Sequence, residues 1–128
     1  MKTLKGFIDN LYSILNVSQV TNAIDGNIYT YKRPLDRKNQ DIVITQLPLK
    51  GRDIQKGVAH INCYVKDLSD DTPDIDNLHE VGSAVVNTLE SYAGKTEFFE
   101  LEFVNQDIVP DNEQRGWSYY SIRLNIYQ

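Results

Sequence analysis

Apolar and polar residues alternate one by one along residues 58–67. The apolar positions are Ala59, Ile61, Cys63 and Val65, and the polar positions are His60, Asn62, Tyr64 and Lys66. A period of two places these two sets on opposite faces of an extended chain. The pattern therefore predicts a half-buried β-strand, which is the clearest element of the sequence.

A helical period follows this strand. Apolar residues recur at steps of three and four, at Ile75, Leu78, Val81, Val85, Leu89 and Tyr92. This spacing predicts a long amphipathic helix with one buried side. We expect Thr72 to cap its first amides, Pro73 to occupy the first helical position and Asp74 to complement the helix dipole. Gly94 suits the end of the helix, and Gly82 is expected to let the helix lie close to a sheet.

A second helical stripe lies in residues 3–16, where the apolar positions are Leu4, Phe7, Ile8, Leu11, Ile14 and Leu15. The spacing predicts an N-terminal amphipathic helix. Residues 17–24 are expected to add one short helical turn. The sequence Asp25-Gly26-Asn27 then favours a tight turn.

Four further segments have the character of strands. Residues 28–32 and 41–47 are rich in β-branched and aromatic residues, and Pro48 is expected to end the second of them. Residues 98–104 alternate around Phe99, Leu101 and Phe103. Residues 117–127 also alternate, and the polar turn 110–116 predicts that these last two strands form a hairpin. In chain order, the elements predict one α+β domain over residues 1–128. It would have a mostly antiparallel sheet of about five strands, with the N-terminal helix and the long central helix on one face.

Composition narrows the classes of function. The 128 residues carry a formal net charge of -5, which argues against nonspecific binding of nucleic acid by the whole surface. The single cysteine, Cys63, falls on the predicted buried face and reads as a core residue in a reducing compartment. Neither a signal peptide nor an apolar run of membrane-spanning length is evident. We therefore expect a soluble chain made in the cytoplasm, without a membrane partner.

Candidate catalytic and metal sites are weak. The acidic loop of residues 67–76 would suit calcium by charge, but it has Thr72 and Leu78 where a calcium loop needs glycine and glutamate. His60 and His79 lack sequence-adjacent ligands for zinc. His79 and Glu80, adjacent on a helix, would point in different directions and so make a poor acid/base pair. We expect neither enzymatic activity nor a metal or cofactor.

Two oppositely charged loops are candidate interaction surfaces. The basic loop contains Lys32, Arg33, Arg37 and Lys38, and the acidic loop contains Asp67, Asp70 and Asp71. They read either as two solvated loops or as complementary surfaces that meet across a head-to-tail subunit contact. Aromatic residues at Tyr29, Tyr31, Trp117, Tyr119 and Tyr127 suit an interface as well, or packing beneath the N-terminal helix. The interface candidates are Arg33, Arg37, Lys38, Asp67, Asp70, Asp71, Trp117 and Tyr119.

Several of these segments, taken in order, resemble a known family. They are Ile24-Asp25-Gly26-Asn27-Ile28-Tyr29, Arg33-Pro34, Asp41-Ile42-Val43-Ile44, Ile61-Asn62-Cys63-Tyr64-Val65 and Asp67-Leu68. Together they resemble small tail-completion or head-tail connector proteins of tailed phages and prophages, nearest to forms from Bacteroides-type bacteria. The resemblance implies a non-enzymatic virion subunit that is made in the bacterial cytoplasm and acts in a ring at the neck or tail end. Its implied partners are other copies of itself and other phage neck or tail proteins.

The resemblance makes a self-assembling virion protein the leading hypothesis. The alternative, from another class, is a small protein-binding or regulatory module that acts as a monomer or dimer through its aromatic strand face. For an enzyme, the sequence offers no convincing set of catalytic residues.

Overall fold

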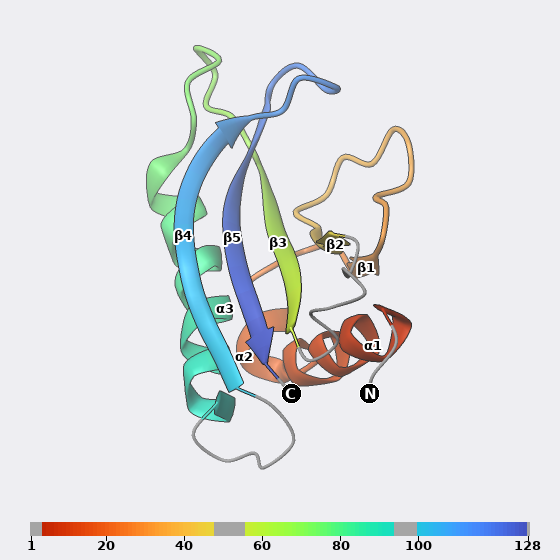
Figure 1. Ribbon diagram of the computed structural model, residues 1–128. Helices are drawn as coiled ribbons and strands as arrows, with labels where there is room; N and C mark the ends of the chain where they lie inside the picture. The colour runs from red at the N-terminus through yellow and green to blue at the C-terminus, as the bar shows by residue number, and fades with distance from the viewer. Residues whose placement is uncertain (1–3, 48–55, 94–99, 128) are drawn as a thin grey trace.

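A computed structural model describes residues 4–47, 56–93 and 100–127. The chain order is α1 (Leu4–Leu15), α2 (Ser18–Thr21), β1 (Ile28–Thr30), β2 (Ile42–Leu47), β3 (Lys56–Lys66), α3 (Ile75–Ala93), β4 (Glu100–Pro110) and β5 (Trp117–Tyr127). The five strands form one sheet, and the helices lie against one of its faces (Figure 1). This arrangement confirms the predicted α+β fold with a mostly antiparallel sheet.

The sheet has the strand order β1-β2-β3-β5-β4. Among the described strands, only β1 and β2 pair in parallel, and Ile28 lies opposite Ile42. The long strand β3 lies at the centre and pairs with both β2 and β5. The register aligns the inward positions of these three strands, so Ile44, Ile61 and Ile122 lie side by side. The predicted hairpin of β4 and β5 is also confirmed.

The helix-covered face forms the apolar core. Its fully buried large side chains come from all the layers: Ile8, Leu11, Leu15, Ile42, Ile44, Ile61, Leu78, Leu89, Ile122, Leu124 and Ile126. Cys63 is buried among them, as its place in the alternation predicts. Helix α3 approaches the sheet closely at Gly82, where a Cβ atom would lie 2.6 Å from the ring of Tyr120. The expected role of Gly82 in this approach is therefore confirmed.

The start of α3 differs from the prediction. The helix begins at Ile75, and the side chain of Asp74 accepts a hydrogen bond from the backbone N–H of Asn77 at 3.2 Å. Asp74 is thus the cap, and Pro73 precedes the helix. The hydroxyl of Thr72 instead donates to Asp70 at 2.5 Å, so the acidic loop uses it for its own turn. Gly94 lies outside the described residues.

The strand boundaries also differ in two places. β1 ends at Thr30 because Tyr31 has a left-handed backbone, with φ of 71°, which no regular strand accommodates. β4 continues to Pro110, well beyond the alternation that predicts it. The register shifts between Phe103 and Asn105, and Val104 is the extra residue of this β-bulge. The bulge interrupts the period of two, which is why the sequence pattern stops there. Pro48 is outside the described residues.

Candidate functional site

The face of the sheet away from the helices is organised around a buried carboxylate. Asp41 immediately precedes β2, and its backbone oxygen accepts a hydrogen bond from the N–H of Tyr64 on β3. Its side chain is fully buried. A buried carboxylate requires charged or hydrogen-bonding partners, because burial alone strongly disfavours the charged form.

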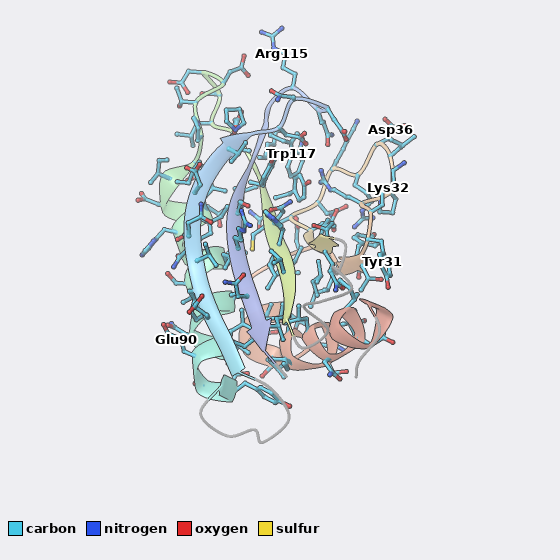
Figure 2. The ribbon with its side chains drawn as sticks, in the orientation of Figure 1. Tyr31, Lys32, Asp36, Glu90, Arg115 and Trp117 are labelled. Carbon is cyan, nitrogen blue, oxygen red and sulfur yellow. The ribbon has the colours of Figure 1, made fainter. Side chains whose placement is uncertain are left out.

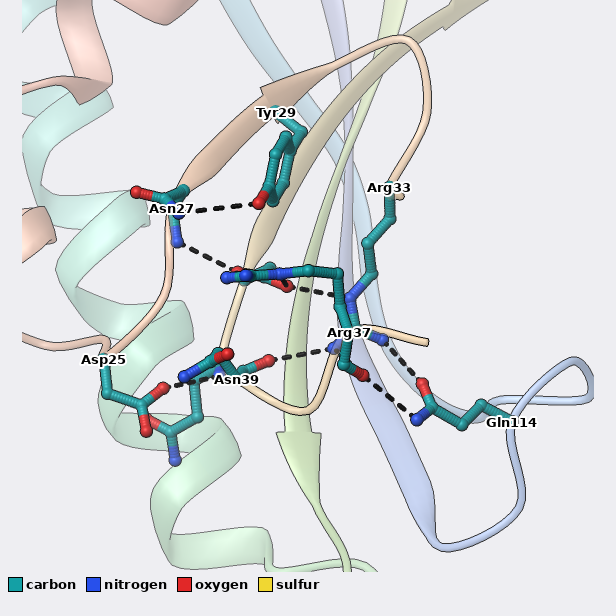
Figure 3. A network of polar contacts seen from close by, with 9 residues as sticks. Asp25, Asn27, Tyr29, Arg33, Arg37, Asn39 and Gln114 are labelled. Carbon is teal, nitrogen blue, oxygen red and sulfur yellow. Dashed lines mark hydrogen bonds and ion pairs between the residues drawn. The ribbon is translucent and has the colours of Figure 1, made fainter. Parts of the chain in front are cut away.

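Four donors from two nearby segments surround Asp41 (Figure 3). Arg37 binds both carboxylate oxygens, with Nε 3.1 Å from Oδ2 and Nη2 3.0 Å from Oδ1. Arg33 Nε donates to Oδ2 at 3.0 Å, and the backbone N–H of Asn27 donates to Oδ1 at 2.9 Å. Charge-assisted and bidentate bonds of this kind are among the strongest that side chains form. The carboxylate thereby holds the loop 31–40 to the start of β1.

Aromatic rings complete the surroundings of the two arginines. The guanidinium carbon of Arg33 lies 4.5 Å from the ring centre of Tyr64 and 4.9 Å from that of Trp117. That of Arg37 lies 5.5 Å from the ring centre of Tyr29. These are cation-π distances. Arg33 therefore covers the aromatic end of the helix-free face while it is paired with Asp41.

The turn between β4 and β5 joins the same network. Arg33 Nη1 donates to Oε1 of Gln114 at 3.0 Å, and Gln114 Nε2 donates to the backbone oxygen of Arg37 at 3.0 Å. Arg33 Nη2 also donates to the backbone oxygen of Asn39 at 2.8 Å. One glutamine thus connects two segments that are far apart in the sequence.

The electrostatics of Asp41 follow from these contacts. Burial by itself would raise the pKa of the carboxyl, but the hydrogen bonds from Arg37, from the backbone of Asn27 and from Arg33 outweigh it and lower the pKa. Asp41 is therefore ionised at neutral pH and acts as a structural anion. Its pairing with Arg37 in turn raises the pKa of that guanidinium.

Gly26 is required beside this carboxylate. A Cβ atom at residue 26 would overlap Oδ1 of Asp41 and would lie 2.7 Å from the backbone oxygen of Gln40. The neighbouring Asp25 accepts a hydrogen bond from the backbone N–H of Gln40 at 2.6 Å. The sequence predicts the turn at residues 25–27 correctly, but the glycine is needed for a close approach to Asp41.

The two charged loops lie at the same end of the sheet (Figure 1). The β4–β5 turn lies between them. Its Gln114 contacts the basic loop, and its Arg115 lies 3.4 Å from Asp71 of the acidic loop. The acidic loop is also held by Asp67, which accepts a hydrogen bond from the hydroxyl of Ser118 at 2.7 Å.

The expectation that the basic loop is an exposed cluster is wrong for two of its members. The side chain of Arg33 is 9% exposed and that of Arg37 is 26% exposed, because both turn inward to Asp41. Lys32 and Lys38 are exposed. In the acidic loop, Asp70 and Asp71 are exposed and Asp67 is half-buried. The surface charge of the basic loop is therefore carried mainly by its two lysines.

The aromatic candidates divide in a similar way. Trp117 is buried beneath Arg33, and the ring of Tyr119 lies 5.1 Å from that of Tyr64. Both are on the face opposite α1, so the alternative that they pack beneath the N-terminal helix is wrong. Tyr31, directly after β1, is 53% exposed (Figure 2). The side chain of Tyr127 is outside the described part of the chain.

The hollows that the described residues form include these two. One, of about 240 Å³, lies on the helix-free face between the loop 31–36 and the turn 111–114. Its floor includes Val43, Thr45, Asn62 and Tyr64. The other, of about 390 Å³, lies between the N-terminal helices and α3, and its lining side chains include Ile14, Val17, Ala84 and Tyr92.

The histidines and the cysteine lie apart from this network. Burial, followed by the charge of Arg123, lowers the pKa of His60, while His79 is exposed on α3 and lies 3.4 Å from the hydroxyl of Ser83. Burial raises the pKa of the Cys63 thiol to about 12. Among residues 4–47, 56–93 and 100–127, no three His, Cys, Asp or Glu side chains are close enough to hold a metal ion.

Sequence reasoning missed Asp41 and Gln114 as organising residues. Asp41 falls at the edge of an apolar run, directly before three buried β-branched residues, with two arginines within eight positions of it. A carboxylate at such a place, with arginines so near, is a usable signal for a buried ion pair. Gln114 gives no comparable signal, because its partners are far from it in the sequence.

No helix in the described part of the chain has both the length and the apolar character needed to cross a membrane. In comparisons with known proteins, no protein-family model and no curated protein matches this chain.

Proposed function

We propose that this chain is a non-enzymatic structural subunit of a tailed phage or prophage, made in the bacterial cytoplasm and incorporated into a head-tail joining or tail-completion ring. Its partners would be further copies of itself and other neck or tail proteins. The proposal begins from the resemblance of its strand and turn segments to small proteins of that family.

The observation that carries the proposal is how those segments are joined in the fold. The turn at Gly26, the loop at Arg33 and the strand start at Asp41 form one block, joined by the bonds to the Asp41 carboxylate. Their polar side chains fix a loop on a sheet and are thereby occupied. Such a block suits a subunit that must present its loops in a constant position to neighbours.

The shape of the charged end adds support. Lys32 and Lys38 are exposed on one loop, and Asp70 and Asp71 are exposed on another, with the β4–β5 turn between them. If the basic loop of one subunit meets the acidic loop of the next, the attraction between these charges would fix the relative position of the two subunits. Arg37 is unsuited to test such a contact, because its substitution would also disrupt the pairing with Asp41.

The first experiment is the mass of the purified chain in solution over a range of concentrations, by sedimentation or light scattering. We expect species several times heavier than the 14.7 kDa chain as concentration rises. A monomer at every concentration, including in mixtures with purified phage neck and tail proteins, would contradict the proposal. It would favour the alternative of a binding module.

A double-mutant cycle then tests the contact between charged loops. Lys38→Gln and Asp71→Asn each remove one exposed charge, and asparagine tolerates the left-handed backbone of residue 71, where φ is 63°. If the two loops meet across subunits, each change weakens association and the double variant is no weaker than either one. Glu90→Gln, on the exposed side of α3, is the matched control. Additive effects of the two variants would contradict a direct contact.

A further inference from the structure

We infer that the groove between the loop 31–36 and the turn 111–114 receives an arginine side chain of a partner protein chain. The groove has a volume of about 240 Å³, room for one large side chain rather than for a folded element. It opens on the helix-free face, beside the network of Asp41. It is a different place from the intersubunit contact proposed for Lys38 and Asp71.

The charge of the groove favours a cation. Three carboxylates line it, from Asp36, Asp111 and Glu113, against the single ammonium group of Lys32. The guanidinium of Arg33, which also lines the groove, is already paired with Asp41 at 3.0 Å. At the floor, burial and then the charge of Asp111 raise the pKa of Tyr64 to about 12, while the charge of Arg33 acts in the opposite direction. An incoming positive charge is therefore attracted to this groove.

The aromatic lining favours a planar guanidinium. Tyr31 and Tyr64 both line the groove. On the same face, the chain already places Arg33 against Tyr64 and Trp117, and Arg37 against Tyr29, with a carboxylate bonded to each guanidinium. The groove repeats this combination of tyrosine rings and carboxylates: Arg33 occupies the ring of Tyr64, while Tyr31 lines the groove together with Asp36, Asp111 and Glu113. Guanidinium groups stack on aromatic rings and bind carboxylates in one plane, which ammonium groups do not.

A polar side chain, that of Asn62, lies at the floor of the groove. Oδ1 of Asn62 is buried and has no hydrogen-bond partner among the described residues. A guanidinium carries five N–H donors, so it can bind a carboxylate and still donate to a further oxygen. At the rim, Tyr31 is 53% exposed and Leu35 is 79% exposed, so apolar surface is present for the stem of the incoming side chain. Large exposed apolar residues beside a groove are typical of contact surfaces.

The inference deepens the proposed function, and it rests on that function only for the source of the arginine, a neighbouring subunit or another tail protein. The groove itself belongs to a single copy of the chain. Binding of a small arginine probe is therefore measurable whether or not the chain forms rings, and failure of one does not entail failure of the other.

The test is a titration of the full-length, ¹⁵N-labelled chain with Nα-acetyl-arginine-N-methylamide, followed by NMR. The neutral comparison is the citrulline analogue, which has nearly the same shape without the charge. We expect saturable shifts of the Asn62 side-chain amide and of the backbone amides of Tyr31 and Thr45. Exposed ion pairs contribute only a modest free energy of interaction. The arginine probe should therefore bind about two- to fivefold more tightly than the citrulline probe.

Matched variants locate the binding. Glu113→Gln should bring the affinity for the arginine probe close to that for citrulline, while leaving the fold intact because the side chain is exposed. Glu90→Gln removes another exposed carboxylate, far from the groove, and should leave the affinity for the arginine probe unchanged (Figure 2). Absence of saturable shifts at Asn62 and Thr45 would overturn the inference. So would equal binding of the two probes, or an equal loss in the two variants.

Discussion

The two faces of the sheet are stabilised in different ways. The face beneath the helices is covered by aliphatic side chains from every layer, and each contact there is one of many. The opposite face is covered at one end by the loop 31–40, which is held through one carboxylate, two arginines and a glutamine. Damage to the first face should therefore spread over the whole molecule. Damage to the second should fall on one loop and one short strand.

The largest expected effect comes from Asp41→Ala. Removing one partner of a buried ion pair leaves the other charges unpaired, at a cost of about 3–5 kcal/mol in the free energy of unfolding. Hydrogen exchange should show loss of protection mainly in β1 and the loop 31–40. Leu124→Ala is the counterpart on the apolar face, with a cost of about 2–5 kcal/mol. It should lower protection throughout the sheet, and the same exchange pattern in both variants would erase the distinction between the faces.

Two glycines, one on each face, allow the same comparison with smaller changes in the free energy of unfolding. Gly82→Ala brings a methyl group 2.6 Å from the ring of Tyr120, and overpacking of this kind costs about 1–3 kcal/mol. Part of this is offset, because alanine is about 1 kcal/mol better than glycine within a helix. Gly26→Ala places its methyl group on the Asp41 carboxylate and the backbone of Gln40, with no helical compensation. Denaturant unfolding should therefore show the larger loss for Gly26→Ala.

The control for the two glycine variants is a second substitution at the residue that each new methyl group would touch. Shortening the aromatic neighbour, in Gly82→Ala with Tyr120→Leu, should recover part of the loss from the helical glycine. Asp41→Asn should not recover the loss from Gly26→Ala, because the amide occupies the same volume. Recovery there would mean that charge, and not space, requires the glycine.

Acid should weaken the polar face selectively. The pKa of Asp41 is lowered in the folded state, so its contribution to stability is complete above the ordinary carboxyl pKa of about 3.9 and is lost as pH falls through the folded value. Unfolding free energies of the wild type and of Asp41→Asn should differ most near neutral pH and converge in acid. A difference that stays constant from pH 7 to pH 3 would contradict the assignment of Asp41 as an anion.

The smallest effect is expected at the exposed ion pair of the same end. Arg115 and Asp71 are 91% and 61% exposed and lie 3.4 Å apart. Exposed pairs contribute about 0–1 kcal/mol, so Arg115→Gln should leave the melting temperature nearly unchanged. A large decrease in the melting temperature would show that the β4–β5 turn is held in place by Arg115 and not by Gln114.

The same contrast explains what the sequence predicts well. The apolar face is encoded by periods of two and of three to four, so α1, α3, β3 and β5 fall close to their predicted bounds. Cys63 and Gly82 also take their predicted roles, because each belongs to such a pattern. Where a bulge breaks the period at Val104, the prediction of β4 stops short.

The polar face is encoded by contacts between distant positions. Exposure of Arg33 and Arg37 was predicted from their place in a polar loop, but Asp41 turns both side chains inward. Gln114 bonds to Arg33 across 81 positions, and no local spacing records such a contact. Thr72 was expected to cap α3, but the acidic loop uses its hydroxyl for its own turn, and Asp74 caps the helix instead.

The two outer strands limit how such a sheet could be extended by another molecule. At one side, β1 offers only three residues to an added strand. At the other, β4 is long, but its ladder is broken by the bulge at Val104, carries exposed carboxylates at Glu102 and Asp107, and ends at Pro110. These features oppose fibre-like growth through backbone pairing. Even where many copies are crowded together, contacts between them should therefore be made by side chains, whose chemistry selects the neighbour and its orientation.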